Sequence, residues 1–218
     1  MNEVAELSPM KDPVILFGIA GISLTILFYL SALAKEWLNK NASTVTTGTI
    51  NSAGAISNPV VGIYDLCGDP NISADEKVLG TIFSKVLKST VYPPRCNVLF
   101  LYCKIGADGK IENTSASLGE IIDASAASIA IVATENIGNH YIQTGKRGPH
   151  SRTNLVMTTN RNGPVFMRFF EKLFNAMNAG EPMTAAWSRL APQIAGMEHK
   201  DCPGTIFSAE LGDITFRN

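Results

Sequence analysis

An uncharged apolar run near the amino terminus constrains this chain more than any other feature. Residues 13–34, PVILFGIAGISLTILFYLSALA, contain no charged side chain, and a helix of that length crosses a hydrocarbon layer of about 30 Å. A cleaved signal peptide and a buried core helix are the alternatives. The run is too long for either, although Ala32-Leu33-Ala34 resembles a cleavage site. The sequence predicts a membrane-spanning helix over residues 13–38, preceded by a short tail, residues 1–12.

The residues beside this run predict its orientation and its packing. Lys35 and Lys40 follow the run and only Lys11 precedes it. Because Lys and Arg are retained on the cytoplasmic side, we expect a single-pass protein whose soluble domain is cytoplasmic. Small residues within the run would let neighbouring helices approach closely and favour a homo-oligomer; they include Gly18, Gly21, Ser23 and Thr25.

The composition after the span is that of one soluble domain. Residues 39–58 are rich in Ser, Thr, Gly and Asn, which is typical of a flexible linker. The remaining residues, 59–218, are enough for one core. A net charge of −1 argues against a DNA-binding surface. The four cysteines follow no metal-ligand spacing, so we expect free thiols, no metal and no cofactor.

The pattern of apolar residues predicts an α/β fold. Four short apolar runs read as buried strands: 60–66, 97–103, 128–134 and 153–159. Helical spacing is found over 75–89, over 164–180 and from Glu181 to about Gly196. Strands that alternate with helices pair in parallel. We therefore expect a three-layer α/β sandwich with a mostly parallel central sheet.

The carboxyl-terminal third resembles the CHAT domains, relatives of caspases. The resemblance is carried by GEPMTAAW, with Gly180, Thr184 and Ala186, and by CPGTIFSAELGDITF, with Pro203, Phe207, Leu211, Gly212 and Asp213. It extends over roughly residues 60–216 and implies a caspase-like fold. It also implies a role in signalling, as in bacterial defence or cell death.

Active members of that family carry a His after one strand and a Cys after the next. The imidazole accepts the thiol proton and the thiolate is the nucleophile. In this chain Lys104 or Ile105 stands at the His position, and Thr134 or Glu135 at the Cys position. The resemblance therefore implies a fold without the peptidase chemistry. An inverted pair of Cys103 and His140 would be another route to an active thiol peptidase, and Cys202 with His199 is a weaker candidate pair because nearness in sequence says little about geometry in the fold.

Polar residues follow each predicted strand and suggest a ligand site. Ligands bind outside the carboxyl ends of strands in open α/β sheets, and a helix beginning near Pro164 would add its dipole. The candidate ligand-binding residues are Asp69, Asn71, Lys104, Asn136, Thr158, Thr159, Asn160 and Arg161. Ordinary turn chemistry would select the same residue types.

Two function classes follow. The first is a membrane-anchored, catalytically inactive caspase/CHAT-like module that binds a protein partner. In the second, a Rossmann-like domain senses a phosphate-rich ligand such as a cyclic oligonucleotide and gates or oligomerises the membrane helix. GIYDLCGDPN, residues 62–71, resembles the nucleotide-sensing CARF domains and favours the second class.

Overall fold

The computed structural model describes residues 54–106, 108, 110–136, 153–191 and 202–217. Its centre is a six-stranded sheet in the order β3-β2-β4-β5-β6-β7. The first five strands in that order run parallel and β7 is antiparallel to β6. Their bounds are Val60–Asp65 for β2, Lys85–Ser89 for β3, Val98–Tyr102 for β4, Ile129–Val132 for β5, Asn154–Asn160 for β6 and Gly204–Ala209 for β7. The α/β class and the mostly parallel sheet are confirmed.

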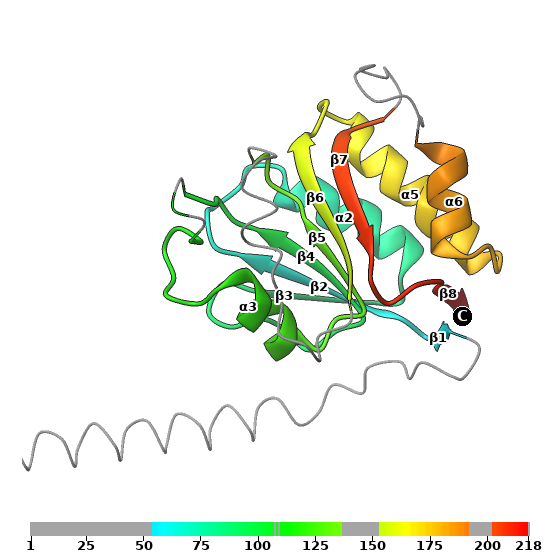
Figure 1. Ribbon diagram of the computed structural model, residues 1–218, viewed down its shortest axis with the longest axis horizontal. Helices are drawn as coiled ribbons and strands as arrows, with labels where there is room; N and C mark the ends of the chain where they lie inside the picture. Colours follow the sequence, from blue (N-terminus) through cyan, green and yellow to red (C-terminus); the bar gives the residue numbers. More distant parts are fainter. Residues whose placement is uncertain (1–53, 107, 109, 137–152, 192–201, 218) are drawn as a thin grey trace, which may run out of the picture. The chain divides into compact units, whose positions relative to one another are not determined.

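Helices cover both faces of this sheet (Figure 1). One face packs against α2 (Ile72–Ile82), α5 (Val165–Asn178) and α6 (Met183–Leu190), and the other packs against α3 (Leu118–Ser125). Alternate residues of each strand point to opposite faces, so both sets must be apolar. In β4 all five residues, VLFLY, are buried.

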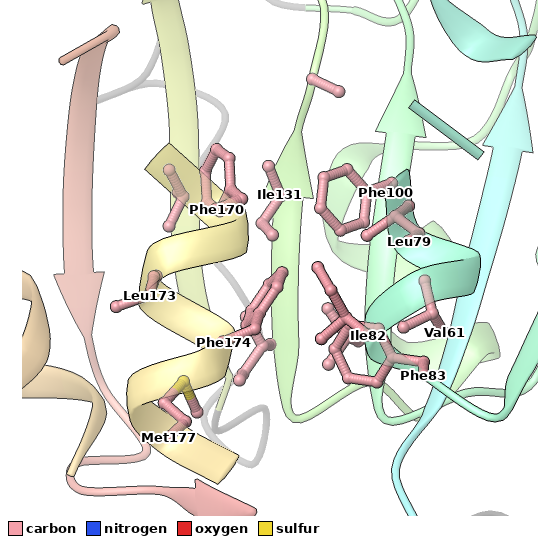
Figure 2. Packing of buried hydrophobic residues seen from close by; sticks show 14 of the residues in the cluster. Val61, Leu79, Ile82, Phe83, Phe100, Ile131, Phe170, Leu173, Phe174 and Met177 are labelled. Carbon is pink, nitrogen blue, oxygen red and sulfur yellow. The ribbon is translucent and has the colours of Figure 1, made fainter. Parts of the chain in front are cut away.

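The larger core lies between the sheet and α5. Helix α5 presents Phe166, Phe170, Leu173, Phe174 and Met177 at three- and four-residue spacing, and all are fully buried. Figure 2 shows Phe170 and Phe174 on the side of α5 that faces Phe100 and Ile131 of the sheet. The aromatic stripe predicted as core packing is therefore core. The helix ends where expected, because Gly180 follows it with φ +90°.

Two short strands join the beginning and the end of the described fold. Strand β1 (Ala55–Ser57) pairs in parallel with β8 (Thr215–Arg217). Ile56 and Phe216 are buried in the larger core. Strand β1 therefore lies within the range predicted as linker, and the domain begins before residue 59. Burial of Ile56 against the other end of the chain could not be inferred from the local Ser, Thr and Gly content.

The prediction of one helix over residues 75–89 was wrong in its second half. Helix α2 ends at Ile82 because Phe83 adopts extended dihedral angles, φ −116° and ψ 136°. Residues 85–89 form β3, which pairs with the outer edge of β2. Val86 and Leu87 pack against opposite cores, as alternation in a strand requires. Pairing with β2 therefore outweighed the helical spacing that continued to Val86.

Two further helices differ from the sequence prediction. Helix α6 ends at Leu190, not near Gly196, since Ala191 is extended before Pro192. Helix α3 was missed, although Ser117 and Glu120 form a capping box in which each side chain accepts from the other's backbone N–H. The Ser-x-x-Glu pattern over residues 117–120 is the sequence signal for the start of this helix.

No described helix combines the length and the apolar character needed to cross a membrane. The predicted span over 13–38, with Gly18, Gly21, Ser23 and Thr25, lies outside the described residues. The tail, most of the predicted linker, His140 and His199 lie outside them as well.

Candidate functional site at the carboxyl ends of the strands

A buried ionic cluster joins four elements at the carboxyl edge of the sheet. Asp75 lies in the first turn of α2, Tyr102 ends β4, and Arg161 follows β6. The Tyr102 hydroxyl donates to Asp75 Oδ2 at 2.7 Å, and Arg161 Nη2 donates to the same oxygen at 2.8 Å. Arg161 Nη1 donates to the Ala133 carbonyl at 2.8 Å, beyond β5. We call Asp75, Tyr102 and Arg161 the edge cluster.

The edge cluster is almost fully removed from water. Asp75 is 3% exposed and Arg161 is 7% exposed. The Arg161 guanidinium lies 4.0 Å from the centre of the Phe166 ring, in a cation–π contact at the start of α5. Burial raises the pKa of Asp75, and the hydrogen bonds from Tyr102 and Arg161 oppose that rise. Burial also raises the pKa of Tyr102, so its hydroxyl stays a proton donor.

The backbone of the loop after β6 is also hydrogen-bonded. The Arg161 amide donates to Glu135 Oε1 at 2.8 Å, so this residue binds the turn after β5 through its main chain and its side chain. Thr158 of β6, three residues before Arg161, is fully buried, and its hydroxyl has no hydrogen-bond partner among the described residues. The arrangement fixes α2 and α5 to the sheet. In this arrangement the Arg161 guanidinium is paired with the buried carboxylate of Asp75.

Asn136 connects the two turns at which the family resemblance places catalytic residues. Its Oδ1 accepts from the Ile105 amide at 2.8 Å, and its Nδ2 donates to the carbonyls of Cys103 at 3.3 Å and Thr134 at 2.9 Å. The turns after β4 and β5 are thus neighbours, and the buried Asn136 side chain hydrogen-bonds to both of them.

The predicted ligand residues are brought to one edge, but most are occupied by internal contacts. Asp69 Oδ1 accepts from the amide and the side chain of Asn71, both at 2.8 Å. Asn160 Oδ1 accepts from the Asn162 amide at 2.8 Å. Thr159 Oγ1 lies beside Gly204 of β7, where an added Cβ would come within 2.8 Å. Lys104 is exposed.

The amino terminus of α5 differs in detail from the expected anion site. Pro164 occupies the N-cap with helical dihedral angles, and no side chain caps the helix. Phe166 follows and covers the Arg161 guanidinium. Arg161, the cation expected to attract a phosphate there, is instead neutralised by Asp75 at 2.8 Å.

The cysteines at this edge lie in different environments. Cys67, after β2, is half-buried, and its Sγ lies 3.7 Å from Thr134 Oγ1 in hydrogen-bond contact. Cys103 is fully buried, and burial raises the pKa of its thiol to about 12. All four cysteines are free thiols. The described residues contain no group of three His, Cys, Asp or Glu side chains placed to hold a metal ion.

The cysteines should therefore differ in their reactivity toward alkylating reagents. We expect Cys96 and Cys103 of the folded protein to react with iodoacetamide at pH 8 far more slowly than Cys67 and Cys202, because a buried thiol with a raised pKa forms little thiolate. Mass spectrometry of the labelled peptides measures this. All four should react at similar rates in denaturant, and fast labelling of native Cys103 would contradict the assignment of an inert thiol.

The sequence interpretation missed two members of the edge cluster. Asp75 was assigned only to a helix, where it stands beside Glu76 and Lys77, and Tyr102 was assigned only to the apolar run 97–103. A lone carboxylate in the first turn of a helix is usually explained by the helix dipole. Their contact joins residues 27 positions apart in sequence, and the Asp75–Arg161 contact joins residues 86 positions apart.

Comparison of the chain with protein-family models, with curated proteins and with solved structures finds no match in any of the three.

Proposed function

We propose that this chain is a membrane-anchored, catalytically inactive signalling or effector protein with a caspase/CHAT-like domain. The helix over residues 13–38 would hold the domain on the cytoplasmic side of a membrane. The domain would act by binding a protein partner, in a homo-oligomer, within a pathway such as bacterial defence or cell death.

One observation supports the proposal that the domain has no thiol-peptidase activity. The paired turns after β4 and β5 hold Lys104 and Ile105 on one side and Thr134 and Glu135 on the other, and Asn136 hydrogen-bonds between them. None of these side chains is a thiol or an imidazole. Cys103 is buried with a strongly raised pKa, which argues against its use as a nucleophile.

A cyclic-oligonucleotide sensor has less support from the same geometry. Such a ligand is recognised by free cations and unoccupied donors. The Arg161 guanidinium is hydrogen-bonded to Asp75, and the Asn136 side chain is hydrogen-bonded to backbone groups. Exposed Lys104 is the candidate that remains among the cationic residues named for this role.

Membrane fractionation tests the anchoring part of the proposal. The full chain should stay with the membrane through alkaline carbonate extraction and leave it only in detergent, because the apolar run spans the bilayer. A variant without residues 1–40 should appear in the soluble fraction. Carbonate-soluble full-length protein would refute the anchor, whatever the domain does.

A further inference from the structure

One exposed apolar turn stands out against a basic stretch of the chain. Among the described residues the large hydrophobic side chains that remain exposed are Val91, at 78%, and Tyr92, at 37%. They follow directly after the edge strand β3. Every other large apolar side chain in the described part of the domain is at least partly covered.

Hydrogen bonds hold the turn that carries them. The amides of Val91 and Tyr92 both donate to Ser89 Oγ at 3.3 Å, and the Val91 carbonyl accepts from the Tyr64 hydroxyl at 3.5 Å. Pro93 and Pro94 follow and restrict the backbone. Two apolar side chains are thus presented to solvent by a preorganised turn.

Pro94 anchors this segment to the sheet. It is buried over Gly62 of β2, where an added Cβ would come within 2.8 Å of Pro94 Cγ and 2.7 Å of Cys96 Sγ. The connection from β3 to β4 therefore crosses the sheet as an extended chain, and only glycine in β2 permits so close an approach. Pro94 is fixed, so the exposure of Val91 and Tyr92 is a property of the fold.

Basic residues precede and follow the turn along the chain. From Lys77 to residue 107 the chain contains five basic residues and neither Asp nor Glu, in a protein whose net charge is −1. Lys85 and Lys88 lie on β3 and Arg95 follows Pro94, and all three are exposed. Lys88 is paired with Glu76 at 3.0 Å, so the other exposed cations of residues 85–95 are Lys85, opposite Val60 at the amino end of β3, and Arg95, which follows the turn.

We propose that Val91 and Tyr92, with Lys85 and Arg95, form a docking surface for an anionic lipid bilayer. Apolar and aromatic side chains enter the headgroup region, and cations near the surface are attracted to anionic lipids. This inference rests on the proposed anchor, which keeps the domain near the bilayer. With β1 beginning at Ala55, the predicted linker is shortened to residues 39–54, and a flexible linker of that length has a root-mean-square reach of about 20 Å. A weak surface is therefore enough for docking.

Quenching by brominated lipids tests this docking in the full chain. The reporter is Tyr92→Trp, placed in a Trp37→Phe background so that the predicted span contributes no signal; Trp187 is buried and serves in every sample as a constant. The protein is reconstituted into vesicles of phosphatidylcholine, with or without phosphatidylserine, whose acyl chains are brominated. We expect Trp at position 92 to be quenched in the anionic vesicles and much less in the neutral ones.

Matched variants identify the source of the effect. Trp introduced by Ala185→Trp, on the exposed face of α6, should not be quenched in either vesicle. Quenching at position 92 should be lost after Lys85→Gln with Arg95→Gln, or in about 1 M salt, where the Debye length falls to about 3 Å. Lys88→Gln should have a smaller effect, because Lys88 is already paired.

The outcomes separate this inference from the anchor. Equal quenching at positions 92 and 185 in a protein that carbonate does not extract would overturn the docking surface and leave the anchor intact. Failure to reconstitute would overturn the anchor itself. A change in Trp fluorescence at position 92 that follows protein concentration in detergent without lipid would assign the surface to a second copy of the chain, against this proposal.

Discussion

Replacing Arg161 by leucine is expected to lower the free energy of unfolding by about 3–5 kcal/mol, because it leaves the Asp75 carboxylate buried without its cation. The Ala133 carbonyl also loses its Nη1 donor, and the Phe166 ring loses its cation–π contact. Urea unfolding of the full chain in detergent, followed by the near-ultraviolet signal of the aromatic core, measures the loss.

Double substitution separates the ionic contact from simple packing. Asp75→Leu with Arg161→Leu should cost less than the sum of the two single changes, because neither charge is then buried alone. Glu76→Gln with Lys88→Gln is the control, since that pair is exposed and should contribute at most about 1 kcal/mol. Additive costs at positions 75 and 161, or a loss below 1 kcal/mol for Arg161→Leu, would show that the cluster is not coupled.

Phe174→Ala is expected to destabilise the domain by a similar amount, about 3–5 kcal/mol. Its ring is fully buried in the larger core, and its centroid lies within 6.2 Å of the centroids of four other rings. These belong to α5, to β4, to β8 and to the residue that follows α2: Phe170, Phe100, Phe216 and Phe83. Removal of the ring therefore opens a cavity where several elements meet.

A smaller substitution at the same position calibrates this result. Phe174→Leu should cost clearly less than Phe174→Ala, since it preserves most of the volume. Val91→Ala, at an exposed position, should change the free energy of unfolding by less than about 0.5 kcal/mol. Thermal unfolding of the three variants under one condition makes the comparison. An alanine variant as stable as the leucine variant would mean that the core relaxes around the gap.

Local patterns predicted the central strands and the long helix correctly. Strands β2, β4, β5 and β6 read as apolar runs because both faces of the sheet are covered, so no polar alternation is needed. Helix α5 was recognisable because its apolar face is regular over 14 residues, between Pro164 and Gly180. In each case the information lies within one segment.

Segments whose partners are distant in sequence were predicted less well. Residues 85–89 continue the spacing of α2, yet they become β3 because the outer edge of β2 offers backbone hydrogen bonds. Strand β1 has a linker-like composition and becomes ordered through β8, at the other end of the described chain. A short stretch of sequence around β3 or β1 does not contain the strand with which it pairs.

The same division applies to the candidate site. The polar residues after each strand were identifiable, and a parallel sheet brings such residues to one edge whatever their sequence distance. Their roles depend on what they meet there. Arg161 could be a ligand cation in sequence, but in the fold it lies 2.8 Å from Asp75. Asn136 could bind a ligand, but its amide hydrogen-bonds the backbone of two turns.

The sequence by itself determined the α/β class, the order of the main elements and the edge where polar residues gather. These depend on residue types and on local periodicity, which the chain carries everywhere. The tertiary structure decided which polar groups at that edge remain exposed, because burial and hydrogen bonding are properties of contacts between segments. Asp75 shows the difference. Helical periodicity predicts that its backbone is helical, but its buried carboxylate is accounted for only by the hydrogen bonds from Tyr102 of β4 and from Arg161 in the loop after β6.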